Sequence, residues 1–507
     1  MEIYSFSPFG YEGAIVTVEV DLRRGIPGVD MVGLADGAVR ESRERMRSAL
    51  LNSDFQFPPE RIVISLSPAD LKKEGAGFDL AIALAVLAAS AGEGGVPEGR
   101  CLVMGELELS GKVRAVRGVN AAAATAREQG ISCCIVPDAN AEEARSVEGM
   151  QVFAASSLRQ AFAGILSYGS WPEYQPLNSL DREEQVEFLP VVPELELADV
   201  RGQEKLVRGL QIAAAGGHNV LAFGPPGCGK TLAMEKFPGL LPLLTWQEAQ
   251  SVTRIYSLTG LLPHNQPLVR ERPFRMPHQS ASLEGLVGGG YHCRPGEISL
   301  AHNGVLFLDE ASEFRTSVLQ ALRVPLETGR VTLSRAGRST TYPARFQLLV
   351  ATNPCPCGNF GVPGKMCLCS MKSVEQFWRK FSAPLLDRMD IRVSVLVPGE
   401  GDAAGLSTQE LRPAITRAVV VQRQRQGKPN DQLQPEEIPE ICCSTAAAQQ
   451  VLNKAVRLEG FSPRGVASCL KVARTIADME GLELISDKAM EEAVQFRRNE
   501  GGMGLCF

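Results

Sequence analysis

Hydrophobic residues in the first third of the chain alternate between two patterns. Runs rich in β-branched residues, such as Ile15–Val20 and Arg61–Ser65, are typical of strands. Between them lie stretches with a helical pattern, such as Ala38–Leu51 and Asn120–Gln129. Strands that alternate with helices predict an α/β unit that ends near Phe153.

A second α/β unit is predicted between Asp199 and about Pro398. Short apolar runs without polar alternation are typical of a parallel sheet that helices cover on both faces. This region contains four such runs, namely Val220–Phe223, Val305–Leu308, Phe346–Val350 and Ile391–Val395. No comparable run follows Gly399, and Ser444–Arg498 is patterned as helices separated by glycines, so we expect a helical C-terminal region.

Turn formers and charges replace periodic apolar residues between the two units, around Trp171-Pro172 and Asp181–Glu184. The expected boundaries are residues 1–165 for the first domain, 166–190 for a linker, 191–400 for the second domain and 401–507 for the helical domain. The most apolar uncharged run, Leu80–Gly92, is shorter than the about 20 residues that span a bilayer. It predicts a buried helix.

Composition narrows the class of protein. The 507 residues are 44% hydrophobic and 22% charged, which is typical of soluble globular domains. With 52 basic and 58 acidic residues the net charge is −6, so any contact with DNA needs a local basic patch. Met1–Phe6 lacks the basic and apolar regions of a signal peptide, and we therefore expect a cytoplasmic protein without a membrane partner.

One motif predicts a phosphate-binding loop. It follows the predicted strand that ends at Phe223 and precedes a helical stretch, as such a loop requires. Its glycines let backbone N–H groups close on phosphate oxygens, Lys230 reaches the outer phosphates, and Thr231 offers a hydroxyl to Mg²⁺. We therefore expect ATP and Mg²⁺ as cofactors. The pattern G-x-x-x-x-G-K-[ST] is formed by Gly224, Pro225, Pro226, Gly227, Cys228, Gly229, Lys230 and Thr231.

Two acids follow the predicted strand Val305–Leu308. A carboxylate at this end of a strand lies beside the phosphate loop in such sheets, so Asp309 is expected to hold Mg²⁺ and Glu310 to polarise the attacking water. Alone, an acidic pair that closes a strand is more often a turn, and only the phosphate loop upstream favours a hydrolase site. The next strand leads to Asn353, whose amide would sense the γ-phosphate or the water.

Four of the 13 cysteines are grouped, as Cys355, Cys357, Cys367 and Cys369. Two close thiolate pairs joined by a turning loop suit a tetrahedral Zn²⁺ or a similar soft metal, although the usual zinc spacing is C-x₂₋₄-C. The alternative is a reduced loop without metal. Most of the other cysteines are expected to be small buried apolar residues.

With these motifs the chain resembles the AAA+ ATPases, specifically the magnesium-chelatase-like branch that contains the ComM/YifB proteins. The resemblance covers nearly the whole chain and implies a ring, typically a hexamer, with ATP between subunits. Besides the phosphate loop it is carried by Pro295–His302, Gly304–Glu310, Asn353–Gly358, Pro384–Asp390 and Ala473–Asp478.

The resemblance also assigns roles to single residues. It implies that Asn353 is sensor 1, that Arg388 is the arginine finger given to a neighbour's γ-phosphate, and that Arg464 is sensor 2 of a helical lid. A guanidinium offers bidentate charge to a developing phosphoryl anion, and supplying it in trans makes hydrolysis depend on assembly. The alternative for Arg388 is a structural salt bridge with Asp387 or Asp390, and Arg464 has a structural alternative too.

The first domain resembles the proteolytic domain of Lon, which has a ribosomal S5-like α/β fold. Lon-type proteases place a nucleophilic serine in K-D-G-P-S-A-G and activate it with a lysine further on. In the matching stretches Gly77 stands in place of the serine and Asn120 in place of the lysine. Without nucleophile and base no acyl-enzyme can form, so we expect a scaffold or substrate-engaging domain.

Two elements are candidates for DNA contact. Residues 329–345 predict a β-hairpin that turns at Ala336-Gly337. In the related helicases a hairpin before sensor 1 faces the pore of the ring, where cations follow a phosphate backbone. The alternative is a solvated surface hairpin, and the basic run Arg412–Lys428 is expected to be a solvated helix face. The candidate contacts are Arg330, Arg335 and Arg338 of the hairpin, with Tyr291 and Arg294 of a glycine-rich stretch.

These observations predict an ATP-driven ring that acts on single-stranded or branched DNA, similar to the branch-migration motors of recombination and natural transformation. The alternative is an ATPase subunit of a magnesium-chelatase-like metal-insertion complex. A protein-remodelling chaperone would need an aromatic, hydrophobic pore loop, and the sequence has no strong candidate for one.

Overall fold

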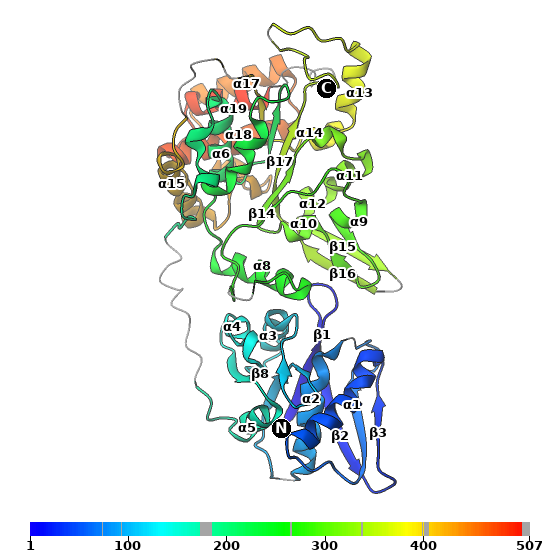
Figure 1. Ribbon diagram of the computed structural model, residues 1–507. Helices are drawn as coiled ribbons and strands as arrows, with labels where there is room; N and C mark the ends of the chain where they lie inside the picture. The colour runs from blue at the N-terminus through cyan, green and yellow to red at the C-terminus, as the bar shows by residue number, and fades with distance from the viewer. Residues whose placement is uncertain are drawn as a thin grey trace.

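The computed structural model describes residues 1–73, 75–92, 94–172, 185–263, 266–335, 338–362, 364–397, 399 and 405–498. It contains one seven-stranded and one five-stranded sheet, each at the centre of one half of the molecule (Figure 1). Helices accompany both sheets, and the predicted α/β multidomain class is confirmed at that level.

The seven-stranded sheet has the order β3-β4-β2-β1-β5-β8-β9. Ile62 and Ile64 of β4 belong to a core shared with α1, α2 and α5, whereas Phe6 and Leu102 belong to a core shared with α3 and α4. α2 is buried from Asp79 to Leu87, which confirms the predicted buried helix. The strands are β1 (Glu2–Ser7), β2 (Ala14–Arg23), β3 (Gly28–Val32), β4 (Arg61–Ser67), β5 (Arg100–Val103), β8 (Cys133–Pro137) and β9 (Gln151–Ala155); the helices are α1 (Gly37–Asn52), α2 (Asp79–Ser90), α3 (Val119–Glu128), α4 (Ala141–Arg145) and α5 (Leu158–Leu166).

The five-stranded sheet has the order β11-β14-β17-β10-β18, and all its strands are parallel. The predicted apolar runs form its four longer strands, and β10 and β14 are buried at every residue, because cores lie on both faces. The strands are β10 (Val220–Phe223), β11 (Phe274–Arg275), β14 (Gly304–Leu308), β17 (Phe346–Thr352) and β18 (Ile391–Ser394). The helices before the C-terminal region include α6 (Glu204–Gly216), α7 (Lys230–Glu235), α8 (Trp246–Thr259), α9 (Leu283–Val287), α10 (Glu297–Leu300), α11 (Thr316–Ala321), α12 (Arg323–Thr328), α13 (Met371–Arg379) and α14 (Ala383–Leu386).

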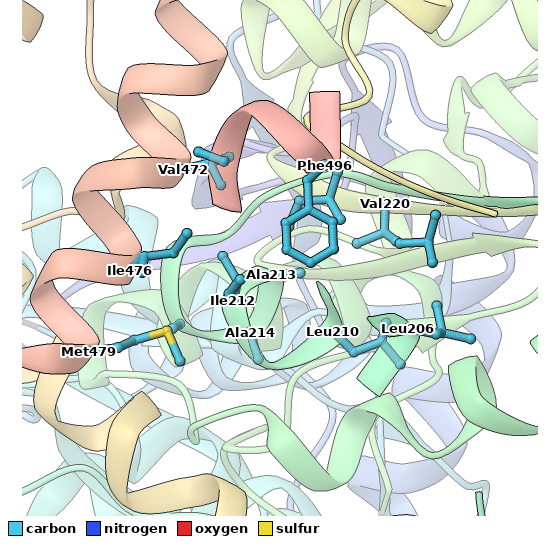
Figure 2. Close-up of a cluster of buried hydrophobic side chains, with 14 of the residues drawn as sticks. Leu206, Leu210, Ile212, Ala213, Ala214, Val220, Val472, Ile476, Met479 and Phe496 are labelled. Atoms are coloured by element: carbon cyan, nitrogen blue, oxygen red, sulfur yellow. The ribbon is translucent and has the colours of Figure 1, made fainter. Parts of the chain in front are cut away.

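Helices alone follow residue 405 in the part of the chain that the structure describes. They pack on α6 and on the sheet through one core, in which Leu210 of α6, Ile476 of α18 and Phe496 of α19 participate (Figure 2). The C-terminal helices are therefore continuous with the second half. They are α15 (Thr408–Gln426), α16 (Ile438–Ile441), α17 (Ala446–Glu459), α18 (Pro463–Glu480) and α19 (Asp487–Arg497).

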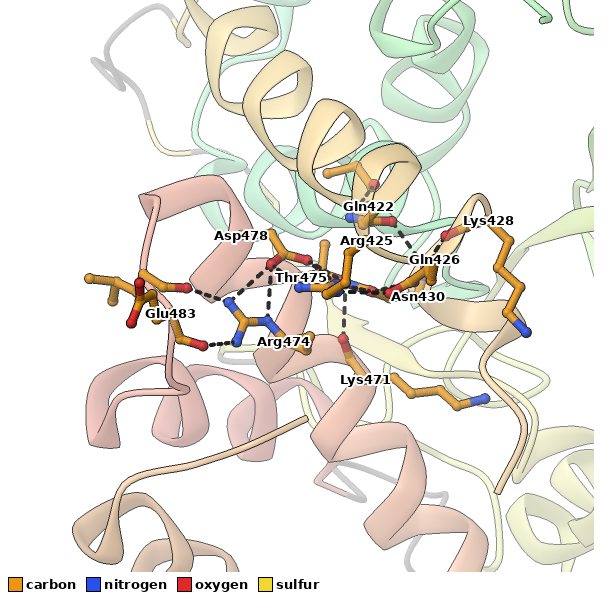
Figure 3. Close-up of polar contacts among 12 residues, drawn as sticks. Gln422, Arg425, Gln426, Lys428, Asn430, Lys471, Arg474, Thr475, Asp478 and Glu483 are labelled. Carbon is orange, nitrogen blue, oxygen red and sulfur yellow. Dashed lines mark hydrogen bonds and ion pairs between the residues drawn. The ribbon is translucent and has the colours of Figure 1, made fainter. Parts of the chain in front are cut away.

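A buried ionic network joins α15 to α18 (Figure 3). The Asp478 carboxylate, whose side chain is 0% exposed, accepts hydrogen bonds from Arg425 at 2.8 and 2.9 Å, from Arg474 at 3.0 Å and from Asn430 at 2.9 Å. Arg417 and Arg425 are exposed, as expected of a solvated basic face. Their guanidiniums, and that of the half-buried Arg412, also have partners within the protein, since Arg412 and Arg417 donate to backbone carbonyls.

The two halves meet along α8, which contacts α3 (Figure 1). The buried Arg254 guanidinium donates to the carbonyls of Tyr11 and Glu12 and to the Thr125 hydroxyl, at 3.0, 3.2 and 2.8 Å. Asn120 is also buried at this contact, where its amide donates to Ser146 Oγ at 3.0 Å and, across the contact, to Gln250 Oε1 of α8 at 3.4 Å. The residue expected in place of a protease lysine thus contacts the second half.

Both ends of the expected linker, residues 166–190, contact the folded halves. Trp171 is buried against the first half, and its indole N–H donates to the Gly164 carbonyl at 2.9 Å. Phe188 pairs with Pro242 of the second half. Residues 173–184 lie outside the described part of the chain. Within the described residues, none of the helices has the length and apolar character needed to cross a bilayer.

Replacing Asp478 with alanine is expected to lower the free energy of unfolding by about 3–5 kcal/mol, because two partly or fully buried guanidiniums lose their carboxylate. Urea denaturation followed by far-UV circular dichroism measures the loss. The matched control is Glu142→Ala, which removes an exposed pair with Arg145 and should cost several-fold less. Equal losses for both variants would contradict the assignment of Asp478 as a structural centre.

Candidate functional site

The phosphate-loop motif lies at the carboxyl end of β10, between that strand and α7. Gly227 and Gly229 adopt φ angles of 77° and 87°, which few other residues tolerate. A Cβ at Gly224 would lie 2.1 Å from the Val395 carbonyl oxygen, so only glycine fits there. The motif thus forms a tight loop at the carboxyl end of β10.

The predicted magnesium ligands are brought together. The Thr231 hydroxyl lies 3.1 and 3.0 Å from the two carboxylate oxygens of Asp309, which follows β14. The Lys230 ammonium group donates to the carbonyls of Gly224 and Pro225, both at 2.8 Å. A hydroxyl beside a carboxylate provides the oxygen ligands that Mg²⁺ prefers. Within the described part of the chain the Lys230 ammonium group contacts backbone carbonyls and no carboxylate, so the donor set fits a magnesium-bound triphosphate.

Glu310 and Asn353 complete this edge of the sheet. Glu310 is exposed and has a φ of 44°, a strained conformation that is common at functional sites. Its backbone N–H donates to Asp309 Oδ1 at 2.9 Å. Asn353 follows β17, which lies between β10 and β14 in the sheet. The parallel register therefore places all the predicted residues of the phosphate site at the carboxyl ends of three neighbouring strands.

Gln203 is a supporting residue that the sequence analysis missed. Its buried side-chain amide donates to the carbonyl of Cys228 in the phosphate loop at 3.1 Å and to that of Leu396 at 2.7 Å. The Gln203 side chain thus links the phosphate loop at Cys228 to the segment after β18 at Leu396. Its position before α6 carries no motif that indicates this contact.

Arg388 lies at the opposite edge of the sheet. It precedes β18, and its carbonyl accepts a hydrogen bond at 3.0 Å from Asn219, the residue before β10. The phosphate loop leaves the other end of β10, and the four residues of this strand span roughly 13 Å. Arg388 is thus separated from the phosphate loop of its own chain by the length of the strand.

Arg388 and Arg464 share one carboxylate, that of Glu327 at the end of α12. Arg388 donates to it at 2.8 Å and Arg464 at 3.0 Å. Neither Asp387 nor Asp390 pairs with Arg388 among the described contacts, so the simple alternative for Arg388 is not supported. Burial and the nearby Arg464 guanidinium lower the pKa of Arg388, and its Nε atom is buried without a hydrogen-bond partner. Two cations and one carboxylate leave a positive excess at this edge.

The candidate DNA contacts lie on two adjoining elements. Arg330 begins the hairpin of β15 (Arg330–Arg335) and β16 (Arg338–Pro343), while Tyr291 and Arg294 lie at the short ribbon of β12 (Gly288–Gly289) and β13 (Arg294–Pro295). A Cβ at Gly288 would lie 3.1 Å from Leu333 of the hairpin, so the elements touch. All three side chains are exposed. The predicted turn at residues 336–337 and the side chains of Arg335 and Arg338 lie outside the described part.

The N-terminal half borders both elements. The Tyr11 ring packs edge-on against Tyr342 of the hairpin with centroids 6.3 Å apart. The Lys72 ammonium group lies 3.2 Å from the Tyr291 hydroxyl and 5.1 Å from its ring centroid. These contacts could not be predicted from the sequence, because side chains far apart in the chain carry no shared pattern.

The four grouped cysteines also come together. Their Sγ atoms lie within 4.8 Å of one another, in the loop between β17 and α13. Of the other nine, seven are buried as expected, Cys443 is exposed, and Cys506 lies outside the described residues.

Three regions of the chain match known protein families. Residues 196–401 match the family "Magnesium chelatase, subunit ChlI", residues 18–140 match "Subunit ChlI of Mg-chelatase", and residues 405–497 match "Magnesium chelatase, subunit ChlI C-terminal". Three families thus cover most of both halves.

Individual relatives give the same result. The chain is 39% identical to YifB of Escherichia coli over 500 residues, which cover 98% of this chain and 96% of the relative. It is 39% identical to the competence protein ComM of Haemophilus influenzae over 503 residues, covering 98% and 97%. The magnesium-chelatase 38 kDa subunit of Rhodobacter capsulatus is 24% identical over 328 residues, which cover 58% of this chain and 82% of the relative. The chain therefore belongs to the ComM/YifB family of magnesium-chelatase-like proteins.

Proposed function

We propose that this protein is an ATP hydrolase that works as a ring, with each ATP held between two subunits. The observation that carries the proposal is the division of the site between two edges of one sheet. Lys230, Thr231 and Asp309 lie at the carboxyl edge, whereas Arg388 lies at the amino edge with Arg464. A neighbour that brings its amino edge to this carboxyl edge completes the site.

At the carboxyl edge the chain's own residues have distinct tasks. Lys230 and the loop backbone hold the phosphates, and Thr231 with Asp309 holds Mg²⁺, which supplies charge neutralisation when bound. Glu310 orients and polarises the attacking water, and Asn353 contacts the γ-phosphate or that water. A Lys230 side chain that now rests on loop carbonyls is free to turn outward to phosphate without breaking an ion pair.

At the amino edge the two arginines serve the neighbour's nucleotide. They lie together on Glu327, and their excess positive charge fits a γ-phosphate that approaches from outside the chain. Arginine supplied in trans is worth about 10³–10⁵ in rate in phosphoryl transfer, so hydrolysis depends on assembly. We propose a hexameric ring.

The motor's substrate in this proposal is DNA, single-stranded or branched, and the function is branch migration in recombination and natural transformation. The adjoining hairpin and ribbon support it, because Arg330, Arg294 and Tyr291 are exposed and offer cations and an aromatic ring without sequence-specific geometry. The relative from Haemophilus influenzae is described as a competence protein.

A chelatase ATPase subunit is the second candidate, because the matching families carry that description. The chelatase relatives cover a smaller part of this chain than the ComM and YifB relatives do. Stimulation of hydrolysis by DNA distinguishes the two.

Glu310→Gln is expected to keep nucleotide affinity and to lower the hydrolysis rate by about 100-fold or more, because the amide binds water but cannot polarise it as a base does. Titration with a fluorescent ATP analogue and a phosphate-release assay measure the two quantities. Lys230→Ala is the matched comparison and should lose affinity as well. Unchanged turnover in Glu310→Gln would remove its assigned role.

Arg388→Ala is expected to lower hydrolysis by about a thousandfold. Lys230→Ala should be inactive too, but a mixture of the two variants should recover activity, since sites form from Lys230 of one chain and Arg388 of the other. Phosphate release is measured across mixing ratios, with light scattering for assembly. Full activity of a monomer, or no recovery on mixing, would contradict the shared site.

Single-stranded and branched DNA should stimulate hydrolysis, and the stimulation should fall with salt. In Arg294→Ala/Arg330→Ala the slope of log affinity against log salt should become shallower by about two, one for each lost phosphate contact. The control is Arg457→Ala, an exposed residue of α17 at the far end of the same half (Figure 1). Stimulation that is absent, or insensitive to salt and to both arginines, would leave the DNA proposal without support.

A further inference from the structure

The four cysteines between β17 and α13 have the spacing of a metal centre. Three of the sulfur pairs are 3.4, 3.5 and 3.7 Å apart, namely Cys355 with Cys357, Cys357 with Cys367 and Cys355 with Cys367. A disulfide would bring two sulfurs to about 2.05 Å. Tetrahedral zinc with Zn–S bonds of about 2.3 Å places its sulfurs about 3.8 Å apart. The cluster is therefore close to the tetrahedral arrangement.

Backbone groups around the sulfurs strengthen this fit. The N–H of Phe360 donates to Cys355 Sγ at 3.3 Å, and the N–H of Asn359 donates to the Cys357 sulfur. Such donors stabilise thiolate ligands and orient them toward a metal. Gly358 in the same turn has a φ of 77°, which glycine adopts more readily than other residues.

The same turn touches the phosphate loop. Gly358 is buried, and a Cβ at this position would lie 2.7 Å from Cδ of Pro226, the third residue of the phosphate-loop motif. The contact leaves no room for a side chain. Movement of the cysteine loop would therefore move or release the backbone that is to wrap the phosphates.

A second path joins the cysteine loop to the strand before the phosphate loop. The carbonyl of Pro354, next to Cys355, accepts a hydrogen bond at 3.0 Å from the buried indole N–H of Trp378 on α13. The Trp378 ring packs edge-on against Phe223, the last residue of β10, with centroids 5.7 Å apart. The cysteine loop thus contacts the phosphate loop through Gly358 and the end of β10 through Trp378.

We propose that Cys355, Cys357, Cys367 and Cys369 bind one Zn²⁺, and that the zinc-bound loop braces the phosphate loop, so that nucleotide affinity depends on the metal. The described residues between Asn353 and Ser370 form no helix or strand, and four metal bonds supply the order that backbone pairing does not. The dependence of nucleotide affinity on zinc rests on the proposed nucleotide site.

Elemental analysis of the full-length protein, purified under reducing conditions without added metal, should give about one zinc per chain. Removing the zinc with a mercurial and a chelator should weaken binding of a fluorescent ADP by about tenfold or more, and added Zn²⁺ with excess thiol should restore it. Cys357→Ser and Cys369→Ser should lose zinc and affinity together. Cys443→Ser, a change at another exposed cysteine, should change neither.

Gly358→Ala tests the contact with the phosphate loop separately from zinc binding. It should keep its zinc but bind ADP several-fold more weakly, because the added methyl group pushes on Pro226. Absent zinc, bound iron in place of zinc, or an ADP affinity that is equal with and without zinc would overturn the inference. If the zinc-loaded protein binds no nucleotide at all, the proposed nucleotide site itself is wrong.

Discussion

The parallel register of β14, β17 and β10 is the constraint on which the site depends. In a parallel sheet all carboxyl ends lie at one edge, so three loops distant in sequence deliver Asp309, Asn353 and Lys230 to one place. The register is held by strands that are almost entirely apolar and by helices on both faces. A slip of one pair would turn these side chains to the wrong face and separate Thr231 from Asp309.

The same geometry keeps Arg388 away from the phosphate-loop motif of its own chain. Backbone contacts of Asn219 and Asp390 fix the residues before β10 and β18 to each other, so the arginine stays at the amino edge. Glu327 holds it there with Arg464 and keeps two like charges side by side. In the proposed ring, a single chain would therefore carry both halves of the nucleotide site but would not be able to close it alone.

Most of the sheet residues and the phosphate site could be predicted from sequence, because local runs and fixed spacings encode them. The phosphate loop, the acids after β14 and the cysteine pairs all follow this rule. Glu327, Gln203 and the Asp478 network could not be predicted, since each depends on residues brought together only by the packing of distant helices. The basic residues of α15 show the same limit: their charge predicts a solvated face, and Arg417 and Arg425 are exposed, but their contacts with the Met479 carbonyl and the Asp478 carboxylate could not be predicted.

The attachment of the N-terminal half to α8 has a mechanical consequence. Arg254 is anchored in the turn at Tyr11 and Glu12, and Ser257 and Gln250 bond to α4 and its following turn, so three successive turns of one helix carry the other half of the molecule. In the proposed motor, a small tilt of α8 would displace the far end of the N-terminal half by a distance that grows with the length of that half.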